Sequence, residues 1–208
     1  MNRIAVLGST GSLGTRCLEV IASHPSAMRL VGLSANRRWK RLGQQAATFA
    51  PRFAVVCDES IRDEVDASAF GNGTELLFGE AGIERLVTAD ETDIVVTGIV
   101  GAAGLRGTWA ALESGKRVAV ANKETLVVAG PLVMELAERH GGEVIPVDSE
   151  HSAVFQAMQA GRLQDVRRIV LTSSGGPFRG ATAAQLAAVT PEQALTHPTW
   201  RMGPKITV

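Results

Sequence analysis

The chain has 208 residues, of which 45% are hydrophobic and 20% charged, and its formal net charge at pH 7 is zero. This composition supports a substantial core and argues against global disorder. The charge balance argues against electrostatic binding to nucleic acid or to an anionic membrane. The first residues predict a strand rather than a secretory signal, and no apolar run approaches the roughly 20 residues of a membrane span. We therefore expect a cytoplasmic protein, with both of its cysteines as core thiols.

Three glycines follow the first apolar run, residues 4–7, which predicts a strand buried on both sides of a parallel sheet. Gly8, Gly11 and Gly14 have the spacing G-x-x-G-x-x-G. The first permits a sharp turn, the second a close approach of the backbone to a ligand, and the third close packing of the next helix. Together with helix N–H groups they predict a phosphate cradle, and a purely structural turn is the alternative. Three hydroxyls are expected to contribute, those of Ser9, Thr10 and Ser12.

Apolar runs alternate with segments of helical periodicity along most of the chain. Helices are predicted at residues 13–22, 39–50, 61–70, 83–89, 105–114, 125–139 and 183–189. Strands are predicted at residues 4–7, 30–33, 53–57, 74–78, 93–101 with a closing glycine-rich turn, 117–121 and 169–171, and from residue 143 onward. This alternation predicts an α/β fold with a Rossmann-like, doubly wound parallel sheet.

The second predicted strand is followed by a basic segment, Asn36-Arg37-Arg38, that contains no acidic residue. An enzyme that selects NAD tends to place Asp or Glu at this point, for the 2′-hydroxyl of the ribose. A guanidinium group instead suits a 2′-phosphate. The segment therefore favours NADP, and a solvated basic turn is the alternative.

A lysine and two carboxylates follow the later strands. Lys123 comes at the carboxyl end of a predicted parallel strand, where open α/β sheets bind ligands. Asp148 and Glu150 are two positions apart, so an extended backbone would place both carboxylates on one side. Such a pair suits Mg²⁺ or Mn²⁺. The alternative is that Asp148 or Ser149 caps a helix that runs through Met158, and the spacing leaves both possibilities open.

Two polar loops follow in the C-terminal part of the chain. Residues 173–178 form a turn rich in hydroxyls and glycine, which is suited to a phosphate. Residues 196–203 read as a loop because of their Pro and Gly, yet they include a His, a Trp and a Met. We expect this loop to be a lid over a site, and a hydrophobic flap packed on the core is the alternative.

Six motifs occur in order along the chain. They are Gly8-Ser9-Thr10-Gly11-Ser12-Leu13-Gly14, Ala121-Asn122-Lys123-Glu124, Val147-Asp148-Ser149-Glu150-His151, Ser174-Gly175-Gly176-Pro177-Phe178, His197-Pro198-x-Trp200 and Met202-Gly203-x-Lys205-Ile206. Together they closely resemble one family, the 1-deoxy-D-xylulose 5-phosphate reductoisomerases. The resemblance spans the whole chain, and it implies NADPH- and divalent-metal-dependent conversion of a sugar phosphate to 2-C-methyl-D-erythritol 4-phosphate. It also implies a homodimer in the bacterial cytoplasm and a place in non-mevalonate isoprenoid biosynthesis.

The resemblance also implies roles for individual residues. Asp148 and Glu150 match two of the family's three metal ligands, which favours a metal over a helix cap for this pair. Lys123, Glu150 and His197 are the implied catalytic residues. Substrate contacts are implied for Lys123, Ser149, Glu150, Ser174, His197 and Trp200. Cofactor contacts are implied for Thr10, Gly11, Ser12, Leu13, Asn36, Arg37, Arg38, Asn122, Glu124 and Gly203.

The resemblance divides the chain into an NADPH-binding Rossmann-like domain, residues 1–147, and the beginning of an α+β catalytic domain, residues 148–208. The family continues with a segment that supplies a third metal ligand and more phosphate contacts, and then with a helical domain. We therefore expect the 208-residue chain to bind NADPH without turnover. Another NADP-dependent enzyme, such as a semialdehyde or homoserine dehydrogenase, and a nucleotide-binding module without catalysis are the competing interpretations. Dependence on a divalent metal separates the reductoisomerase from both.

Overall fold

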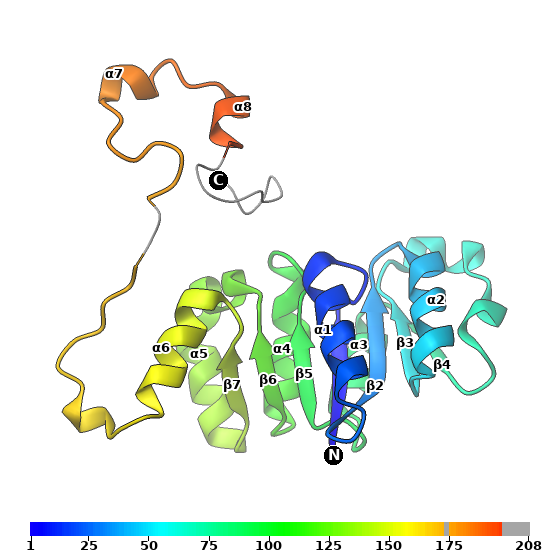
Figure 1. The fold of residues 1–208 in the computed structure, drawn as a ribbon. Coiled ribbons are helices and arrows are strands. Elements are labelled where there is room, and N and C mark those ends of the chain that lie inside the picture. Colours follow the sequence, from blue (N-terminus) through cyan, green and yellow to red (C-terminus); the bar gives the residue numbers. More distant parts are fainter. Residues whose placement is uncertain (173–174, 197–208) are drawn as a thin grey trace. The chain divides into compact units, whose positions relative to one another are not determined.

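A computed structural model describes residues 1–172 and 175–196 of the chain. Seven parallel strands form one sheet in the order β4-β3-β2-β1-β5-β6-β7 (Figure 1). This confirms the predicted α/β fold with a parallel sheet. The strands are β1 (Asn2–Leu7), β2 (Met28–Ala35), β3 (Phe53–Val56), β4 (Glu75–Phe78), β5 (Ile94–Thr97), β6 (Arg117–Val120) and β7 (Glu143–Pro146).

Helices connect the strands and cover both faces of the sheet (Figure 1). The α-helices are α1 (Ser12–Ser23), α2 (Trp39–Phe49), α3 (Gly79–Thr88), α4 (Ala103–Glu113), α5 (Lys123–His140), α6 (Ser149–Met158), α7 (Ala183–Leu186) and α8 (Pro191–Ala194). Three short 3₁₀ helices are η1 (Glu59–Glu64), η2 (Ala67–Phe70) and η3 (Leu163–Asp165). No helix within residues 1–172 and 175–196 is both long enough and apolar enough to cross a membrane.

The apolar sequence of β1 follows from its burial on both sides. Successive side chains of a strand point to opposite faces of the sheet. Ile4 and Val6 therefore join the buried cluster beneath α1 and α2, whereas Ala5 and Leu7 join the cluster beneath α3, α4 and α5. Because neither face of β1 meets solvent, the strand has no polar side.

The order of the strands creates a crevice beside β1. The chain runs outward from β1 through β2 and β3 to β4, and then returns to the other side of β1 as β5. The loops after β1 and β5 consequently lead to helices on opposite faces of the sheet, which separates them at the carboxyl ends of the strands. Ligands of open α/β sheets bind at such a switch point.

The chain divides into two compact units, Met1–Ala157 and Met158–Val208. The first unit holds the sheet and its covering helices, and the second holds η3, α7 and α8. The domain boundary expected between residues 147 and 148 stays a prediction.

Two predicted elements differ in the structure. Residues 61–70 form parts of two 3₁₀ turns and not one helix, because Asp58 and Asp66 each cap a separate turn through the backbone N–H of the serine two residues later. Residues 169–171 are exposed and lie outside any strand, although a strand was predicted there. An apolar run becomes a strand only when it pairs, and none of the described strands pairs with residues 169–171.

Candidate functional site

Glycines shape the turn between β1 and α1. Gly8 has a φ of +78°, and a Cβ at this position would lie 3.0 Å from the carbonyl carbon of Gly98 after β5. A Cβ on Gly14 would collide with the carbonyl oxygen of Gly8 and lie 2.5 Å from the Cα of Ser9. Both positions therefore require glycine for the sharp turn and for the packing of α1 against it, as predicted. The unpaired N–H groups at the start of α1 consequently lie at the carboxyl end of β1.

Ser9 does not contribute its hydroxyl to the turn's outer surface, and this part of the predicted phosphate cradle is wrong. The Ser9 side chain is fully buried, and its hydroxyl donates to Gln45 Oε1 at 2.7 Å and lies 3.2 Å from the Ser34 carbonyl oxygen. Gln45 Nε2 donates in return to the Ser9 carbonyl at 3.0 Å. The hydroxyl points inward because a buried polar atom needs a partner, and α2 supplies one. Gln45 therefore stabilises the turn through hydrogen bonds on its buried side.

A pocket of about 610 Å³ opens at the carboxyl ends of the central strands. Its volume lies in the range of small-molecule sites, about 300–1,000 Å³. The structure thus brings the glycine-rich turn and the basic segment into one cavity, although they are far apart in the sequence. Ser12 and Leu13 begin α1 directly after this lining. The predicted cofactor residues in the lining are Thr10, Gly11, Asn36, Arg37 and Arg38.

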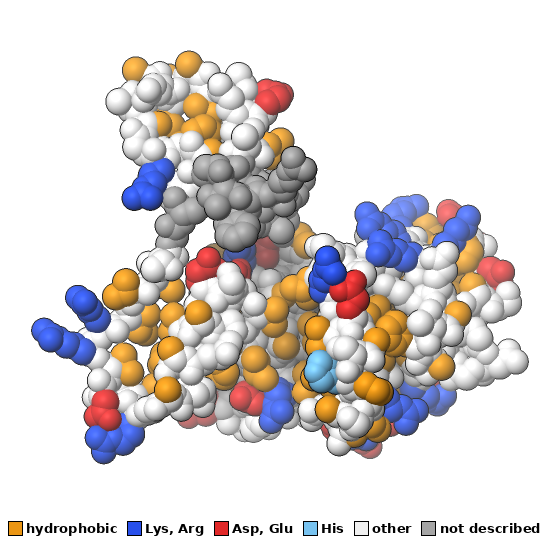
Figure 2. Space-filling model, in the orientation of Figure 1, with side chains coloured by type: hydrophobic (Ala, Val, Ile, Leu, Met, Phe, Trp, Pro, Cys, Tyr) orange, Lys and Arg blue, Asp and Glu red, His pale blue; other side chains and the backbone are white. Residues whose placement is uncertain are grey.

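Positive charge gathers at one side of this pocket. Figure 2 shows Lys and Arg side chains clustered over the start of α2, where Arg37, Arg38, Lys40 and Arg41 are exposed. Arg38 Nη1 donates to the Thr10 carbonyl at 3.4 Å, so this side chain bridges the basic segment and the glycine-rich turn. A dianionic phosphate at this point would meet two guanidinium groups at the edge of solvent.

Arg37 forms an ion pair with Asp58, the second residue after β3. Arg37 Nη1 lies 3.0 Å from Asp58 Oδ2. Asp58 also accepts hydrogen bonds from the hydroxyl and the backbone N–H of Ser60, and these bonds, with the Arg37 charge, lower the pKa of the Asp58 carboxyl. Asp58 therefore stays ionised at neutral pH and orients the guanidinium group of Arg37, whose side chain is 60% exposed.

Asn122 connects two loops at the carboxyl ends of β5 and β6. Its side-chain amide donates to the carbonyl oxygens of Ile99 and, at 2.7 Å, of Gly101. Its Oδ1 accepts from the Thr125 backbone N–H at 3.1 Å, so Asn122 is the N-cap of α5. Asn122 is buried, and its three bonds fix the loop that forms one wall of the pocket. The predicted cofactor residue Glu124 lies in the first turn of the same helix.

Lys123 and the two predicted metal ligands form a second polar group. Lys123 Nζ donates to Asp148 Oδ2 at 3.0 Å, which joins the start of α5 to the end of β7. This bond is the main cause of the lowered pKa of Asp148. The pKa of Glu150 is lowered mainly by a hydrogen bond from the Ser149 hydroxyl, 2.7 Å from Glu150 Oε2, and the Lys123 charge contributes. Both carboxylates are therefore ionised at neutral pH.

The backbone around these carboxylates is helical, so the extended alternative for Asp148 and Glu150 does not occur. Helix α6 begins at Ser149, because the Asp148 carbonyl accepts the backbone N–H of Ser152 at 2.8 Å and closes the first turn. The alternative, a helix that begins here, is therefore present. Glu150 is exposed, whereas Asp148 is partly exposed and binds Lys123. Among residues 1–172 and 175–196, no group of three or more His, Cys, Asp and Glu side chains forms a metal site.

Four predicted site residues lie outside the described part of the chain. These are Ser174, His197, Trp200 and Gly203. Most of the predicted lid loop at residues 196–203 lies outside it as well.

Sequence reasoning missed several residues that line the pocket. Cys57 packs against the core, as predicted, and also lines the cavity after β3; burial raises the pKa of its thiol. Glu80 and Arg106 come from the first turn of α3 and from α4. No motif marks these positions, and Glu80 and Arg106 meet only because α3 packs against α4.

The parallel sheet and the pocket at its switch point define a Rossmann-like α/β protein. The family model for 1-deoxy-D-xylulose 5-phosphate reductoisomerase matches residues 4–130, and the model for the C-terminal domain of this family matches residues 144–208. The chain therefore belongs to the 1-deoxy-D-xylulose 5-phosphate reductoisomerase family. This membership excludes the competing assignment to a homoserine or semialdehyde dehydrogenase.

Curated relatives and solved structures agree with this assignment. The reductoisomerase of Geotalea uraniireducens (strain Rf4) is 46% identical over 208 residues, and that of Laribacter hongkongensis (strain HLHK9) is 48% identical over 213 residues. The alignments cover 100% of this chain but 54% and 55% of these relatives, so the chain spans about half their length.

Two solved structures have the same fold. The Zymomonas mobilis reductoisomerase in complex with NADPH matches with a TM-score of 0.85 and 38% identity, over 95% of this chain and 52% of that one. A reductoisomerase in complex with NADPH, fosmidomycin and magnesium matches with a TM-score of 0.83 and 35% identity, over 100% of this chain and 53% of that one.

Proposed function

We propose that this chain supplies the NADPH-binding part and two metal ligands of a 1-deoxy-D-xylulose 5-phosphate reductoisomerase. The observation that carries the proposal is the single pocket lined by both the glycine-rich turn and the Arg37-Arg38 segment. NADPH is the ligand of two similar structures. The reaction proposed is the rearrangement and reduction of the sugar phosphate to 2-C-methyl-D-erythritol 4-phosphate, within non-mevalonate isoprenoid biosynthesis.

The pocket suits NADPH in both shape and charge. Gly11 lines the pocket and has no Cβ to hold a ligand away from the backbone, and the N–H groups of α1 suit the pyrophosphate. The guanidinium groups of Arg37 and Arg38 suit the 2′-phosphate that distinguishes NADPH from NADH. When bound, NADPH supplies a hydride for the reduction. We assign Thr10, Gly11, Ser12, Leu13, Asn36 and Asn122, with Glu124 and Gly203, to the same cofactor site.

Asp148 and Glu150 suit a hard divalent cation because both are ionised oxygen donors. Magnesium is present in a similar structure, and manganese is the other candidate. A bound cation would act as a Lewis acid toward substrate oxygens. Lys123 would then neutralise negative charge at the same point, since it already lies against Asp148. Ser149, Ser174, His197 and Trp200 are proposed to contact the substrate.

The oligomeric state, the location and the domain boundary are also part of the proposed function. We propose a homodimer in the bacterial cytoplasm, and a domain boundary between residues 147 and 148. Two carboxylates are an incomplete set for Mg²⁺, which demands octahedral coordination. We therefore propose that turnover needs the half of the relatives' length that this chain does not match.

A titration of NADPH fluorescence tests the proposal. The 208-residue chain and a chain extended to the relatives' length are each titrated with NADPH, with and without Mn²⁺ and fosmidomycin. Both chains should bind NADPH, and only the longer one should bind fosmidomycin in a metal-dependent manner and oxidise NADPH with substrate. Asp148→Asn in the longer chain should abolish the metal dependence, while the matched carboxylate variant Asp63→Asn, in η1, should retain it. A longer chain that ignores both metal and fosmidomycin would refute the proposal.

A further inference from the structure

An ion pair outside the basic segment forms part of the pocket wall. Arg106 of α4 and Glu80 of α3 both line the pocket, and Arg106 Nη1 lies 2.5 Å from Glu80 Oε2. Arg106 Nη2 also lies 3.9 Å from Glu84 Oε2, one turn further along α3. Neither acid belongs to the glycine-rich turn or to the basic segment.

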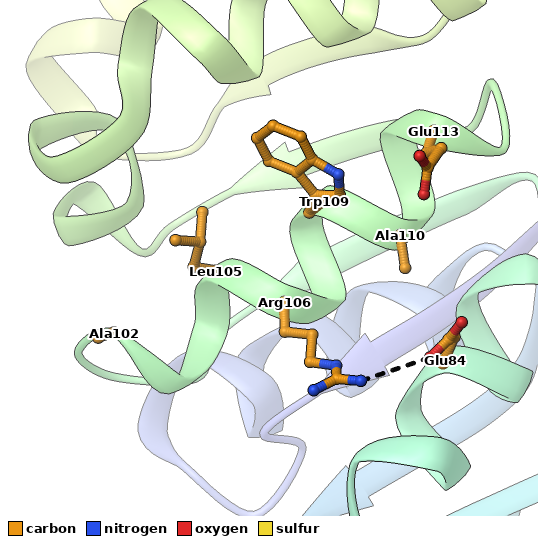
Figure 3. Close-up of a pocket in the computed structure, with 7 residues that line it drawn as sticks. All are labelled: Glu84, Ala102, Leu105, Arg106, Trp109, Ala110 and Glu113. Carbon is orange, nitrogen blue, oxygen red and sulfur yellow. Dashed lines mark ion pairs between the residues drawn. The ribbon is translucent and has the colours of Figure 1, made fainter.

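Figure 3 shows how the arginine is held. Arg106 extends from α4 toward Glu84 on α3, while Trp109 and Leu105 project from other sides of α4. The guanidinium group is therefore oriented by two carboxylates although its side chain is 61% exposed. A flexible arginine loses conformational entropy when it binds a ligand, and an arginine that is already fixed loses less.

The local charge makes this part of the wall unsuited to phosphate. Glu80 and Glu84 offset the positive charge of Arg106, whereas Arg37 has a single acidic partner and Arg38 binds a carbonyl. A second phosphate site would place its anion against two carboxylates, which repel it. A neutral planar group meets no such repulsion, and it is stabilised by stacking on the flat face of a guanidinium group.

The neighbouring lining is apolar. Ile83 lies between Glu80 and Glu84 on α3, and Ala103 begins α4 one turn before Arg106. Both line the pocket together with Ile99, which follows β5. Aliphatic side chains and a planar cation together form a surface for an aromatic ring. A dinucleotide whose phosphates occupy the glycine-rich turn and the basic segment has one neutral aromatic group on the ribose that carries the 2′-phosphate, its purine base.

We propose that Arg106, positioned by Glu80, binds the adenine base of the dinucleotide through the face of its guanidinium group. This inference rests on the proposed NADPH function and adds a base-recognition residue to that site. Because the base is common to NADPH and NADH, Arg106 contributes to affinity for both nucleotides and not to the choice between them. Arg37 and Arg38 govern that choice.

Binding of NADPH and NADH to Arg106→Met tests this assignment. The dissociation constants for both nucleotides should rise by the same factor, roughly three- to thirtyfold, as expected for a lost cation–π contact. Arg106→Lys should show nearly the same loss, since lysine retains the ion pair with Glu80 but lacks the planar face. Glu80→Gln should weaken both nucleotides by a smaller common factor. The control is Arg139→Met, which removes an exposed arginine paired with Glu135 on α5 and should bind like the wild type.

Other results of these binding measurements would contradict the inference or the proposed function. Unchanged affinity of Arg106→Met for both nucleotides overturns the inference, and so does a loss confined to NADPH, which would assign Arg106 to the 2′-phosphate. Full recovery in Arg106→Lys, with a melting temperature restored from a lowered value in Arg106→Met, would assign Arg106 a purely structural role. Failure of the wild-type chain to bind either nucleotide would refute the proposed function itself.

Discussion

The side chain of Gln45 binds two polar groups of Ser9, accepting from its hydroxyl at 2.7 Å and donating to its carbonyl oxygen at 3.0 Å. Ser9 is the second residue of the glycine-rich turn, and Gln45 lies in the middle of α2. The hydrogen bonds therefore connect the phosphate-binding turn to a helix on the face of the sheet. Ser34 adds to this support, since its hydroxyl accepts the backbone N–H of Gly8 at 3.1 Å. The position of the turn thus depends on polar contacts beneath it.

Replacing Gln45 by leucine should destabilise the fold and weaken NADPH binding. The variant leaves the Ser9 carbonyl without this donor and removes one partner of its buried hydroxyl, which costs about 1–3 kcal/mol of unfolding free energy. Urea denaturation and NADPH titration measure the two effects. The control is Gln44→Leu, which changes the adjacent, exposed glutamine of the same helix. Equal behaviour of the two variants would show that the contact does not support the turn.

Replacing Gly14 by alanine should disrupt the turn directly. The new Cβ would meet the Gly8 carbonyl and the Ser9 backbone, and backbone atoms in a well-packed turn have little room to move. We expect a loss of about 1–3 kcal/mol in unfolding free energy, together with loss of NADPH binding. Gly130→Ala in α5 is the matched control, because its Cβ would meet nothing within 4 Å. That variant should be neutral or slightly more stable. Retained NADPH affinity in Gly14→Ala would contradict the close packing.

The double variant Arg37→Gln, Arg38→Gln should lose the preference for NADPH. Each guanidinium offers charge-assisted hydrogen bonds to a 2′-phosphate, worth about 1.5–3 kcal/mol apiece. Both side chains are exposed, and solvent screening reduces these contributions. The ratio of the NADH and NADPH dissociation constants should therefore fall about ten- to a hundredfold, by loss of NADPH affinity with NADH unchanged. Arg52→Gln serves as the control, since Arg52 precedes β3 at the opposite end of that strand. A preference that survives in the double variant would rule out the basic segment as the selectivity element.

The sheet was predictable because its signal is local. Each central strand is buried on both faces, and continuous apolar runs such as residues 4–7 and 53–57 follow from that burial. Residues 61–70 also place Ile61 and Phe70 in the core, yet the capping aspartates Asp58 and Asp66 divide the segment into two turns. Hydrophobic spacing alone does not distinguish a helix from two turns that bury the same side chains.

Site residues that follow strands could be predicted from the sequence, whereas site residues within helices could not. The position of Lys123 after β6 and of Asp148 after β7 placed both at one edge of a parallel sheet, and the structure joins them at 3.0 Å. Gln45 and Arg106 lie within helices, where a polar residue most often faces solvent. Their contacts depend on how α2 packs near the turn and how α4 packs against α3. Such contacts arise from tertiary packing and leave no pattern in a single sequence.

Asp93 should make the stability of the sheet depend on pH between about 4 and 2. Arg3 donates to its carboxylate from the backbone N–H at 2.8 Å and from the guanidinium at 3.0 and 2.7 Å, which joins β1 to the residue before β5. These bonds lower the pKa of Asp93 from 3.8 to about 2. A lowered pKa in the folded state means that the stabilisation is complete above 3.8 and is lost as the pH falls through 2.

Asp93→Asn should therefore reduce the unfolding free energy at pH 7 and flatten its decline at acidic pH. Because the Asp93 side chain is 37% exposed, solvent screens the pair, and we expect a loss of about 1 kcal/mol at pH 7. Urea denaturation at pH 7, 4 and 2.5 measures this, with the exposed neighbour Asp90→Asn as control. The difference in unfolding free energy between wild type and Asp93→Asn should shrink as the pH falls, because protonation then removes the same negative charge that the variant lacks. A difference that stays constant from pH 7 to 2.5 would mean that hydrogen bonding to a neutral side chain, and not the ionised carboxylate, joins β1 to β5.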